Sequence, residues 1–404
     1  MMMKIEKKAF LYLSIFIVLI TFGISYVHWD AAIMSPITYL VYILIILKVF
    51  SNYKKITGCE SVFKTGILSM FLLPLISVLP LYAYGEESVF HSIRFFLEPS
   101  VYLVYFLLIY YQVNPETIKK LLLIWGIIIA VIFIVQQLMP DYAVFGVFSK
   151  AIMKVEGLEE QVYMRNGLYR YRLDSFFYVS LFSVFYAWNK LTERHSLFYL
   201  LLFLIYAVAI YLYLARQILA ITIFVIAISM VIEKKQHKLL IPIAALSIGL
   251  YAYKDLLFGN FLESTNDDLN SDYIRFFTFN FFWNKIIDNP IVFLFGHGHM
   301  PNIERMWADN LSVYTADVGL IGPLYYHGIV WFVAFVAFLV SIFKKFDHMP
   351  LYLKMFFLSI TIDLIFISPT ERASHMFFMM LAVYLLECHL YVKSKNIYRK
   401  KSVK

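Results

Sequence analysis

The strongest constraint on this chain is its succession of apolar runs, many of them about 18 residues or longer. A helix of that length spans the hydrocarbon core of a bilayer, which is roughly 30 Å thick. Composition agrees, because 61% of the 404 residues are hydrophobic and only 15% are charged. The regular alternation of membrane β-barrel strands is absent from the sequence. We therefore predict an all-α, polytopic integral membrane helix bundle.

The runs predict about twelve transmembrane helices within a single membrane domain, residues 1–404. The first run follows three lysines, and no small-residue cleavage site follows it, so we expect a membrane helix there and not a signal peptide. The expected spans are 9–27, 37–50, 65–84, 95–111, 121–138, 174–189, 196–213, 217–232, 239–254, 318–343, 350–368 and 375–392.

Lysines in alternate turns set the predicted orientation. With twelve spans, these turns share one face with both termini. Cytoplasmic loops carry an excess of Lys and Arg, so we predict a multi-pass protein with both termini in the cytoplasm. The same lysines suit the anionic lipids of that leaflet. They are Lys54, Lys55, Lys119, Lys120, Lys190, Lys234, Lys235, Lys238, Lys344, Lys345 and the lysines of the tail 393–404.

Two long loops fall on the opposite, outer face, at residues 139–173 and 255–317. Long connections inside a compact fold are usually functional or disordered. These are rich in aromatic residues and glycine, so we expect them to fold back over the bundle. Within the second loop, the stretch "NFFWNKIIDNPIVFLFG" (280–296) predicts a short helix along the membrane interface, where aromatic residues are frequent.

Arginines divide between the faces in the opposite way to lysines. Only Arg194 and Arg399 are predicted on the cytoplasmic face. The arginines predicted on the outer face or its rim are Arg94, Arg165, Arg170, Arg172, Arg216, Arg275, Arg305 and Arg372. The planar guanidinium matches phosphate oxygens and stays charged at any usable pH. The set favours phosphate recognition by at least two of its members. The alternative is that each arginine pairs with a carboxylate of its own loop.

Arg216 lies between two apolar runs, in "YLYLARQILAITIF". A charge at that place is costly unless it faces a polar cavity or a partner. We interpret it as a phosphate ligand at the mouth of the bundle, with an interfacial, snorkelling arginine as the alternative. Two carboxylates also lie in or near spans. Glu98 follows Arg94 by four residues, a spacing that favours an ion pair, and Asp363 is suited to neutralising an arginine of the cavity.

The most polar stretch of the second loop is "FGHGHMPNIERMWADNLSVYTADVGLIGPLYYHG", residues 295–328. It gathers His, Asp, Asn and Gly between strongly apolar flanks. One interpretation of "GHGH" is a tight turn, in which glycine adopts backbone angles that other residues avoid. A metal site needs more ligands in a defined geometry, and we expect none.

The order of these motifs resembles the bacterial O-antigen polymerase and O-antigen ligase superfamily. The resemblance covers roughly residues 160–330. It is carried by an arginine that begins a mid-chain helix, an arginine before an Asn-Pro and Gly-x-Gly turn, and an Asp-Asn pair followed by an acidic residue and Gly-x-x-Gly. Those places are held by Arg216, Arg275, Asn289, Pro290, Gly296, Gly298, Asp309, Asn310, Asp317, Gly319 and Gly322.

The resemblance implies glycosyl transfer at the outer face of the bacterial cytoplasmic (inner) membrane. A polymerase of this kind moves a growing glycan from undecaprenyl pyrophosphate onto the next lipid-linked repeat unit, and a ligase moves the finished glycan onto lipid A-core. The product of a polymerase is O-antigen, capsule or exopolysaccharide. The leaving group is already activated, so no cofactor is expected. The implied partners are the undecaprenyl-pyrophosphate-linked glycan, membrane lipids, a chain-length regulator and a flippase, and no nucleic acid.

The same resemblance implies roles for individual residues. Asp309, Asp317 and His299 are the candidate catalytic residues that orient the acceptor hydroxyl. Asp317 has an alternative role as the cap of the following helix. Ligases tend to carry His where this chain has Asp309, which favours a polymerase. The candidate pyrophosphate and glycan ligands are Arg216, Arg275, Arg165, Arg170, Arg172 and Asn310.

Three other classes stay open. A lipid-linked-oligosaccharide flippase has a similar number of spans, but it is expected to show short loops and internal two-fold similarity. A secondary transporter is expected to show midplane charges and interrupted helices. In this sequence the polar residues concentrate in the outer loops. A non-catalytic partner in envelope assembly also fits the composition.

Overall fold

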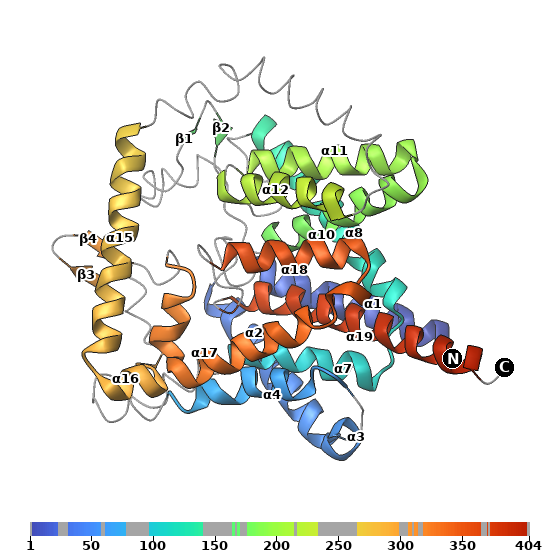
Figure 1. Cartoon of the computed structure of the whole chain (residues 1–404), viewed down its shortest axis with the longest axis horizontal. Coiled ribbons are helices and arrows are strands. Elements are labelled where there is room, and N and C mark those ends of the chain that lie inside the picture. The colour runs from blue at the N-terminus through green and yellow to red at the C-terminus, as the bar shows by residue number, and fades with distance from the viewer. Residues whose placement is uncertain are drawn as a thin grey trace.

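A computed structural model of the chain is predominantly helical (Figure 1). The residues that it describes are 2–22, 31–57, 61–77, 97–139, 164–165, 168–169, 176–213, 216–232, 265–298, 306–308, 311–313, 318–364, 370 and 372–401. Every expected span except 239–254 contains a described helix, and 239–254 lies outside the described residues.

The helices of the bundle follow the apolar runs. They are α1 (Met2–Phe22), α2 (Ala31–Ser51), α4 (Lys64–Leu72) with η1 (Leu73–Leu75), η2 (Glu98–Leu103) with α7 (Val104–Tyr110), α8 (Pro115–Leu138), α10 (Phe176–Arg194), α11 (Leu197–Leu212), α12 (Arg216–Ile232), α17 (Ile321–Phe343), α18 (Leu351–Asp363) and α19 (Ala373–Lys401). The helix α3 (Tyr53–Thr57) and η7 (Phe346–His348) occupy turns.

Three of the described helices are long and apolar enough to cross a membrane: α8, α17 and the part of α19 from Ala373 to Tyr391. The helical class is therefore confirmed, and these three helices support membrane association. The expected count of about twelve crossings is not confirmed, because in the other apolar helices the described stretches cover only 10–17 residues. The turns between those helices are nevertheless where the apolar runs predict them.

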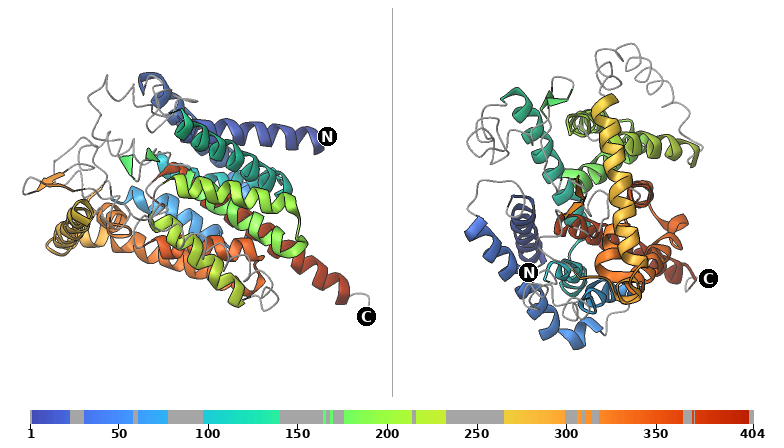
Figure 2. Two further views of the ribbon diagram at one scale, coloured as in Figure 1. Left: turned by 90° about the horizontal axis from the view of Figure 1, so that it is seen from above. Right: turned by 90° about the vertical axis from the view of Figure 1, so that its left-hand side faces the viewer.

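The two ends of the bundle differ in what they carry (Figure 2). Both chain termini lie at one end, which we call the terminal end. The helices α15 (Thr265–Ile287) and α16 (Pro290–Phe295) lie at the other, which we call the distal end, together with two short hairpins. The hairpins pair β1 (Met164–Arg165) with β2 (Leu168–Tyr169), and β3 (Met306–Ala308) with β4 (Leu311–Val313), both antiparallel. The strands depart from a purely helical fold. All four strands that the structure describes lie in the expected loops 139–173 and 255–317, where backbone groups without helical partners pair with each other.

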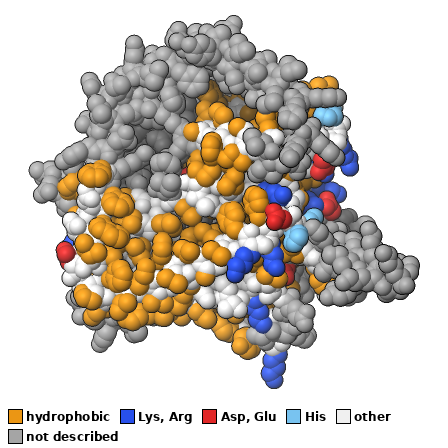
Figure 3. Space-filling model, viewed as in Figure 1, with side chains coloured by type: hydrophobic (Ala, Val, Ile, Leu, Met, Phe, Trp, Pro, Cys, Tyr) orange, Lys and Arg blue, Asp and Glu red, His pale blue; other side chains and the backbone are white. Residues whose placement is uncertain are grey.

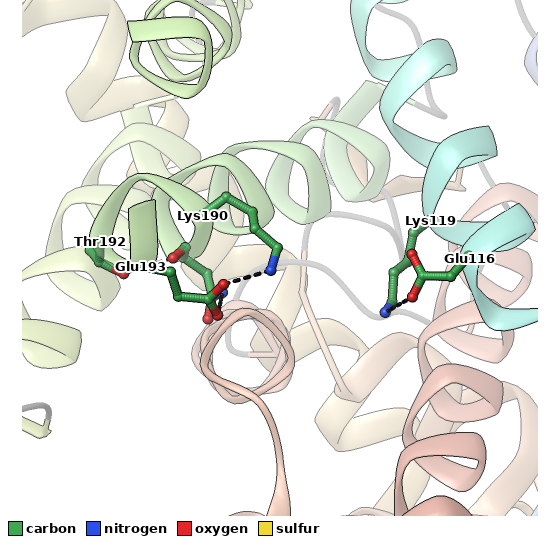
Figure 4. Close-up of polar contacts among 6 residues, drawn as sticks. Glu116, Lys119, Lys190, Thr192 and Glu193 are labelled. Carbon is green, nitrogen blue, oxygen red and sulfur yellow. Dashed lines mark hydrogen bonds and ion pairs between the residues drawn. The ribbon is translucent and has the colours of Figure 1, made fainter. Parts of the chain in front are cut away.

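In two of the lysine-bearing turns, a lysine forms an ion pair with a glutamate of its own helix (Figure 4). Lys119 in the first turns of α8 pairs with Glu116 at 2.6 Å, and Lys190 near the end of α10 pairs with Glu193 at 2.6 Å. The Nζ of Lys119 also lies 6.0 Å from the ring centre of Tyr352, at the start of α18. The turns before α8 and after α10, which carry these two lysines, lie toward the terminal end (Figure 2).

Candidate functional site at the distal end

A backbone interlock joins α16 to α17 at the distal end. The helix α17 contains a break at Gly328, which has φ 74° and ψ 177°. Helical hydrogen bonding is interrupted there, so carbonyls of the preceding turn need other partners. The backbone N–H of His297 donates to the Tyr325 carbonyl at 2.7 Å, and that of Gly298 donates to the Tyr326 carbonyl at 3.1 Å. The turn after α16 thus supplies the missing donors.

Glycine is required on both sides of this interlock. Gly296 has φ 83° and ψ 167°, a region of backbone angles that is essentially restricted to glycine. A Cβ at Gly296 would lie 2.2 Å from the carbonyl oxygen of Tyr326. A Cβ at Gly328 would lie 2.5 Å from the backbone nitrogen of Gly296. The "GHGH" turn is therefore a site of close backbone packing within the protein.

The interlock also fixes two histidines. The ring of His297 stacks on that of Tyr325, with ring centres 5.0 Å apart and planes 17° apart. His327 follows Tyr326 in α17 and lies 5.1 Å from the ring of Trp331. Both imidazoles are half-buried among aromatic rings. Histidines from two segments of the distal end are thus held against α17.

The helix α15 is packed onto the same region. Phe282 and Ile286 of α15 form a small buried core with Val292 of α16 and with Leu324 and Tyr325 of α17. Asn289 caps α16, because its side chain accepts hydrogen bonds from the backbone N–H groups of the next turn. The α15–α16 part of the second loop is therefore held on the bundle by a hydrophobic core that it shares with α17.

Ring contacts between α10 and α18 show that the end of α18 lies beside the start of α10. The ring of Tyr352 lies 5.2 Å from Tyr186, and the ring of Phe356 lies 6.1 Å from Tyr178. Because the numbers run in opposite directions, the two helices are antiparallel. Asp363 is two turns beyond Phe356, roughly 10 Å further along the axis. It therefore lies at the distal end, just past the level where α10 begins.

The start of α12 lies at the same level. Trp188 of α10 donates from its indole N–H to the hydroxyl of Ser229 on α12, at 3.1 Å. These two helices run in the same direction, and α12 also packs against α18. Arg216 is the first residue of α12, roughly 20 Å back along the axis from Ser229. The backbone of Arg216 and the carboxylate of Asp363 are thus brought to one end of the bundle.

Asp363 is the most unusual charged group of the described bundle. It is fully buried. Neither carboxylate oxygen has a hydrogen-bond partner among the residues that the structure describes. Burying an unpaired carboxylate costs free energy, so a buried carboxylate at the end of an apolar helix is a candidate for function. Asp363 is expected to neutralise an arginine of the cavity. The side chain of Arg216, the candidate at the mouth of the bundle in the sequence argument, is not among the side chains that the structure describes.

A second carboxylate has a structural role at the same end. An oxygen of Glu98 accepts a hydrogen bond of 2.6 Å from the backbone N–H of Ala373, the first residue of α19. A negative charge suits the start of a helix, where N–H groups lack helical partners. Sequence spacing favours a pair between Glu98 and Arg94, and Arg94 lies outside the described residues.

Two buried aromatic polar residues lie close to this cap. His375, in the first turn of α19, meets Tyr178 of α10 edge to face, with ring centres 4.6 Å apart. The sequence argument missed both residues. A histidine inside an apolar run, in "ERASHMFFMM", was the available signal. Neither lies in the outer loops on which that argument concentrated.

The predicted site residues are placed only in part. Arg216 begins α12, Arg275 lies within α15 and Arg165 lies in β1. All three belong to the elements of the distal end, and their side chains are outside the description. The positions outside the described residues altogether are Asp309, Asp317, His299, Arg170, Arg172 and Asn310. Within the described part of the chain, no group of three or more His, Cys, Asp or Glu side chains is arranged to hold a metal ion.

Comparison of the chain with protein-family models, with curated proteins and with solved structures found no match.

Proposed function

We propose that this protein is a membrane glycosyltransferase that polymerises undecaprenyl-pyrophosphate-linked oligosaccharide repeat units. Its product would be O-antigen, capsule or exopolysaccharide. One observation carries the proposal: the backbones of Arg216 and Arg275 and the buried carboxylate of Asp363 lie at the end of the bundle opposite the lysine-bearing turns. This is the arrangement expected for an enzyme that works on a lipid pyrophosphate at the outer face.

The proposed location is the bacterial cytoplasmic membrane, with both termini in the cytoplasm. The shared position of the termini and of the lysine turns supports this orientation, since cytoplasmic turns are enriched in lysine. Tags at the C-terminus and within 233–238 should report the cytoplasm, and tags within 150–160 and 260–270 should report the outer face. Cytoplasmic accessibility of either long loop would overturn the orientation.

The proposed reaction breaks the bond between the anomeric carbon of the donor glycan and a pyrophosphate oxygen. The bonding electrons leave with undecaprenyl pyrophosphate, and the oxygen of an acceptor hydroxyl bonds to the anomeric carbon. The acceptor proton passes to a base. Arginines stabilise the charge that develops on the leaving group, and the acceptor must be held in line with the reacting carbon. In this proposal, Arg216 and Arg275 take the first role.

In this proposal the acceptor hydroxyl is oriented by Asp309, Asp317 or His299, all on the second loop. Asp→Asn and Asp→Ala variants separate the roles open to Asp317. A helix cap tolerates Asn nearly as well as Asp, so Asp317→Asn would keep activity if capping were its whole role. A base would lose activity in both variants. Normal-length polymer from Asp309→Ala and Asp317→Ala would move the acceptor site elsewhere.

The decisive experiment is elongation by the purified protein in proteoliposomes. A purified lipid-linked repeat unit is supplied as the only substrate, and product length is followed by gel or mass spectrometry. The proposal expects polymer together with released undecaprenyl pyrophosphate. Product formed only when lipid A-core is added would favour the ligase. Partner proteins, namely a chain-length regulator or a flippase, would alter the length distribution without being needed for bond formation.

Asp363 favours a second candidate, a lipid-linked-oligosaccharide flippase or transporter. Ionisable residues buried in membrane helices are common in ion-coupled transporters. In that case the protein would move a fluorescent lipid-linked oligosaccharide across the bilayer and form no glycosidic bond. Asp363→Asn would abolish the movement. Elongation without any movement would exclude this candidate.

A further inference from the structure

The helix α15 presents three distinct faces over residues 276–288. Its buried face holds Thr278, Phe282 and Ile286, which pack toward the bundle. Beside it runs an exposed apolar stripe, which we call the α15 stripe: Phe276, Phe279, Trp283 and Ile287. At 100° per residue these four positions fall on one side of a helix. Phe276 is 66% exposed, so the stripe is not part of the protein core.

The remaining side of α15 is mixed. Phe277 and Phe281 are half-buried there and pack against the small core, whereas Asn284 and Lys285 are exposed and form the polar face of the helix. At helical spacing these two polar residues point away from the centre of the stripe. The α15 stripe is apolar and not covered by the described residues, which indicates an apolar environment beside it other than the protein core.

The α15 stripe continues onto a membrane-spanning helix. The next helix, α16, exposes Ile291, Leu294 and their neighbours, and α17 exposes Val330 and Val333. Figure 3 shows hydrophobic side chains over much of the visible face of the molecule, in the region where Figure 1 places α15, α16 and α17. Since α17 is a candidate membrane span, its exposed valines lie where acyl chains would contact them. The stripe borders the same environment.

The direction of α15 fits this environment. It runs across the distal end, transverse to the helices of the bundle (Figures 1 and 2). A helix in that direction lies along a membrane surface and does not cross the membrane. Aromatic residues are enriched at the boundary between lipid and water, where their rings sit at headgroup level. Interfacial helices place one apolar face about 5–10 Å deep in that boundary.

We propose that α15 is an interfacial membrane anchor, in which the α15 stripe inserts into the leaflet on the distal side of the bilayer. The partner is phospholipid, and the polar face of α15 stays in water. The buried core of α15 against α16 and α17 sets the depth of insertion. This holds part of the second loop at the lipid surface, whatever reaction the protein performs. The inference is therefore independent of the proposed function.

The test compares adjacent positions on α15. In a background in which Cys59 and Cys388 are changed to Ser, single Trp283→Cys and Asn284→Cys variants are labelled with an environment-sensitive fluorophore. Both are reconstituted into phosphatidylcholine vesicles that contain a nitroxide just below the headgroup. We expect a blue-shifted emission and several-fold stronger quenching at position 283 than at position 284. Equal quenching at the two positions would overturn the proposal.

Two further measurements keep the result decisive. Phe279→Cys on the stripe, compared with Lys285→Cys on the polar face, repeats the test if Trp283→Cys disturbs folding. A second copy of the chain is another possible cover for the stripe. In that case position 283 would be shielded from the lipid nitroxide, and the blue shift would fade as protein is diluted in lipid. That outcome would also overturn insertion into lipid.

Discussion

The charged groups at the two ends of this molecule are stabilised in different ways. At the terminal end, Lys119 and Lys190 pair with glutamates three residues away, on the same helix turn and partly in solvent. At the distal end, Glu98 binds a backbone group 275 residues away, and Asp363 is buried with no partner among the described residues. Long-range contacts are not confined to the distal end, because Glu387 on the terminal side of α19 accepts hydrogen bonds from the backbone N–H of Val62 at 3.3 Å and from the hydroxyl of Tyr105 at 3.2 Å. The distal end differs in the buried carboxylate of Asp363, which has no partner among the described residues, and this marks it as the candidate for a specific task.

The largest expected effect comes from the interlock at the distal end. Gly296→Ala or Gly328→Ala places a Cβ against backbone atoms and strains a glycine-only conformation, with a cost of at least about 2 kcal/mol. Thermal unfolding in detergent should show a clear loss of stability for each. The matched control is Val333→Ala on the same helix as Gly328, because Val333 is 60% exposed and its truncation places no atom against the backbone. An interlock variant that melts like the unmodified protein would show that this packing is dispensable.

Arg216 gives the next largest effect, on activity and not on folding. Arg216→Ala should lower elongation by roughly 10²–10³-fold, because a charge-stabilising donor is lost at the leaving group. Arg216→Lys should rescue poorly, since a point charge lacks the paired donors of guanidinium. Arg194→Ala at the terminal end is the control and should leave elongation unchanged. Near-normal polymer from Arg216→Ala would reassign Arg216 to an interfacial role.

A substitution at Asp363 should change activity and thermal stability in different ways. Asp363→Asn removes a carboxylate that gains nothing from its described surroundings, so the melting temperature should stay the same or rise. Elongation or lipid movement should fall, according to which activity the protein has. The exposed Glu116→Gln at the terminal end is the control, and its activity should be unchanged. A marked fall in the melting temperature of Asp363→Asn would reveal a stabilising partner.

The smallest effect is expected at the terminal end. Burial raises the pKa of Glu193, but hydrogen bonds from Lys190 and Asn189 outweigh it, and the net pKa is below the ordinary glutamate value. The contribution of Glu193 to stability is therefore present above its unfolded pKa and is lost as pH falls through the folded pKa. Glu193→Gln should cost about 0–1 kcal/mol at neutral pH and nothing in strong acid. Melting curves of both proteins across that pH range check the sign.

The sequence predicts the bundle well because its signal is local. An apolar run of sufficient length is helical in lipid whatever it packs against, so the expected spans correspond to described helices apart from 239–254. The boundaries follow local chemistry too. Asn114 caps α8 through the backbone N–H of Glu116, at 3.0 Å, and Pro115 occupies the first turn. Such signals are contained within a few residues.

The distal end is less predictable because its partners are far apart in sequence. The "GHGH" turn is recognisable from its glycines, but nothing local indicates that it docks on the break at Gly328. The span 318–343 accordingly looks like a single helix in the sequence. Likewise, His375 and Tyr178 resemble ordinary core residues until the fold brings α10 and α19 together. Register between distant helices depends on packing, which periodicity does not encode.

The break in α17 has a consequence for the lipid around the protein. Only the part after Gly328, from Ile329 to Phe343, continues as a straight rod, and at 1.5 Å per residue it is about 22 Å long. That is several ångströms less than the hydrocarbon thickness of a typical bilayer, roughly 30 Å. The helix before the break, from Ile321 to His327, must therefore supply the rest of a crossing, at the angle that Gly328 sets. Where it turns away from the membrane normal, the two headgroup layers would draw together beside α17, at a modest cost per ångström of mismatch, and the membrane would be thinnest at the distal end.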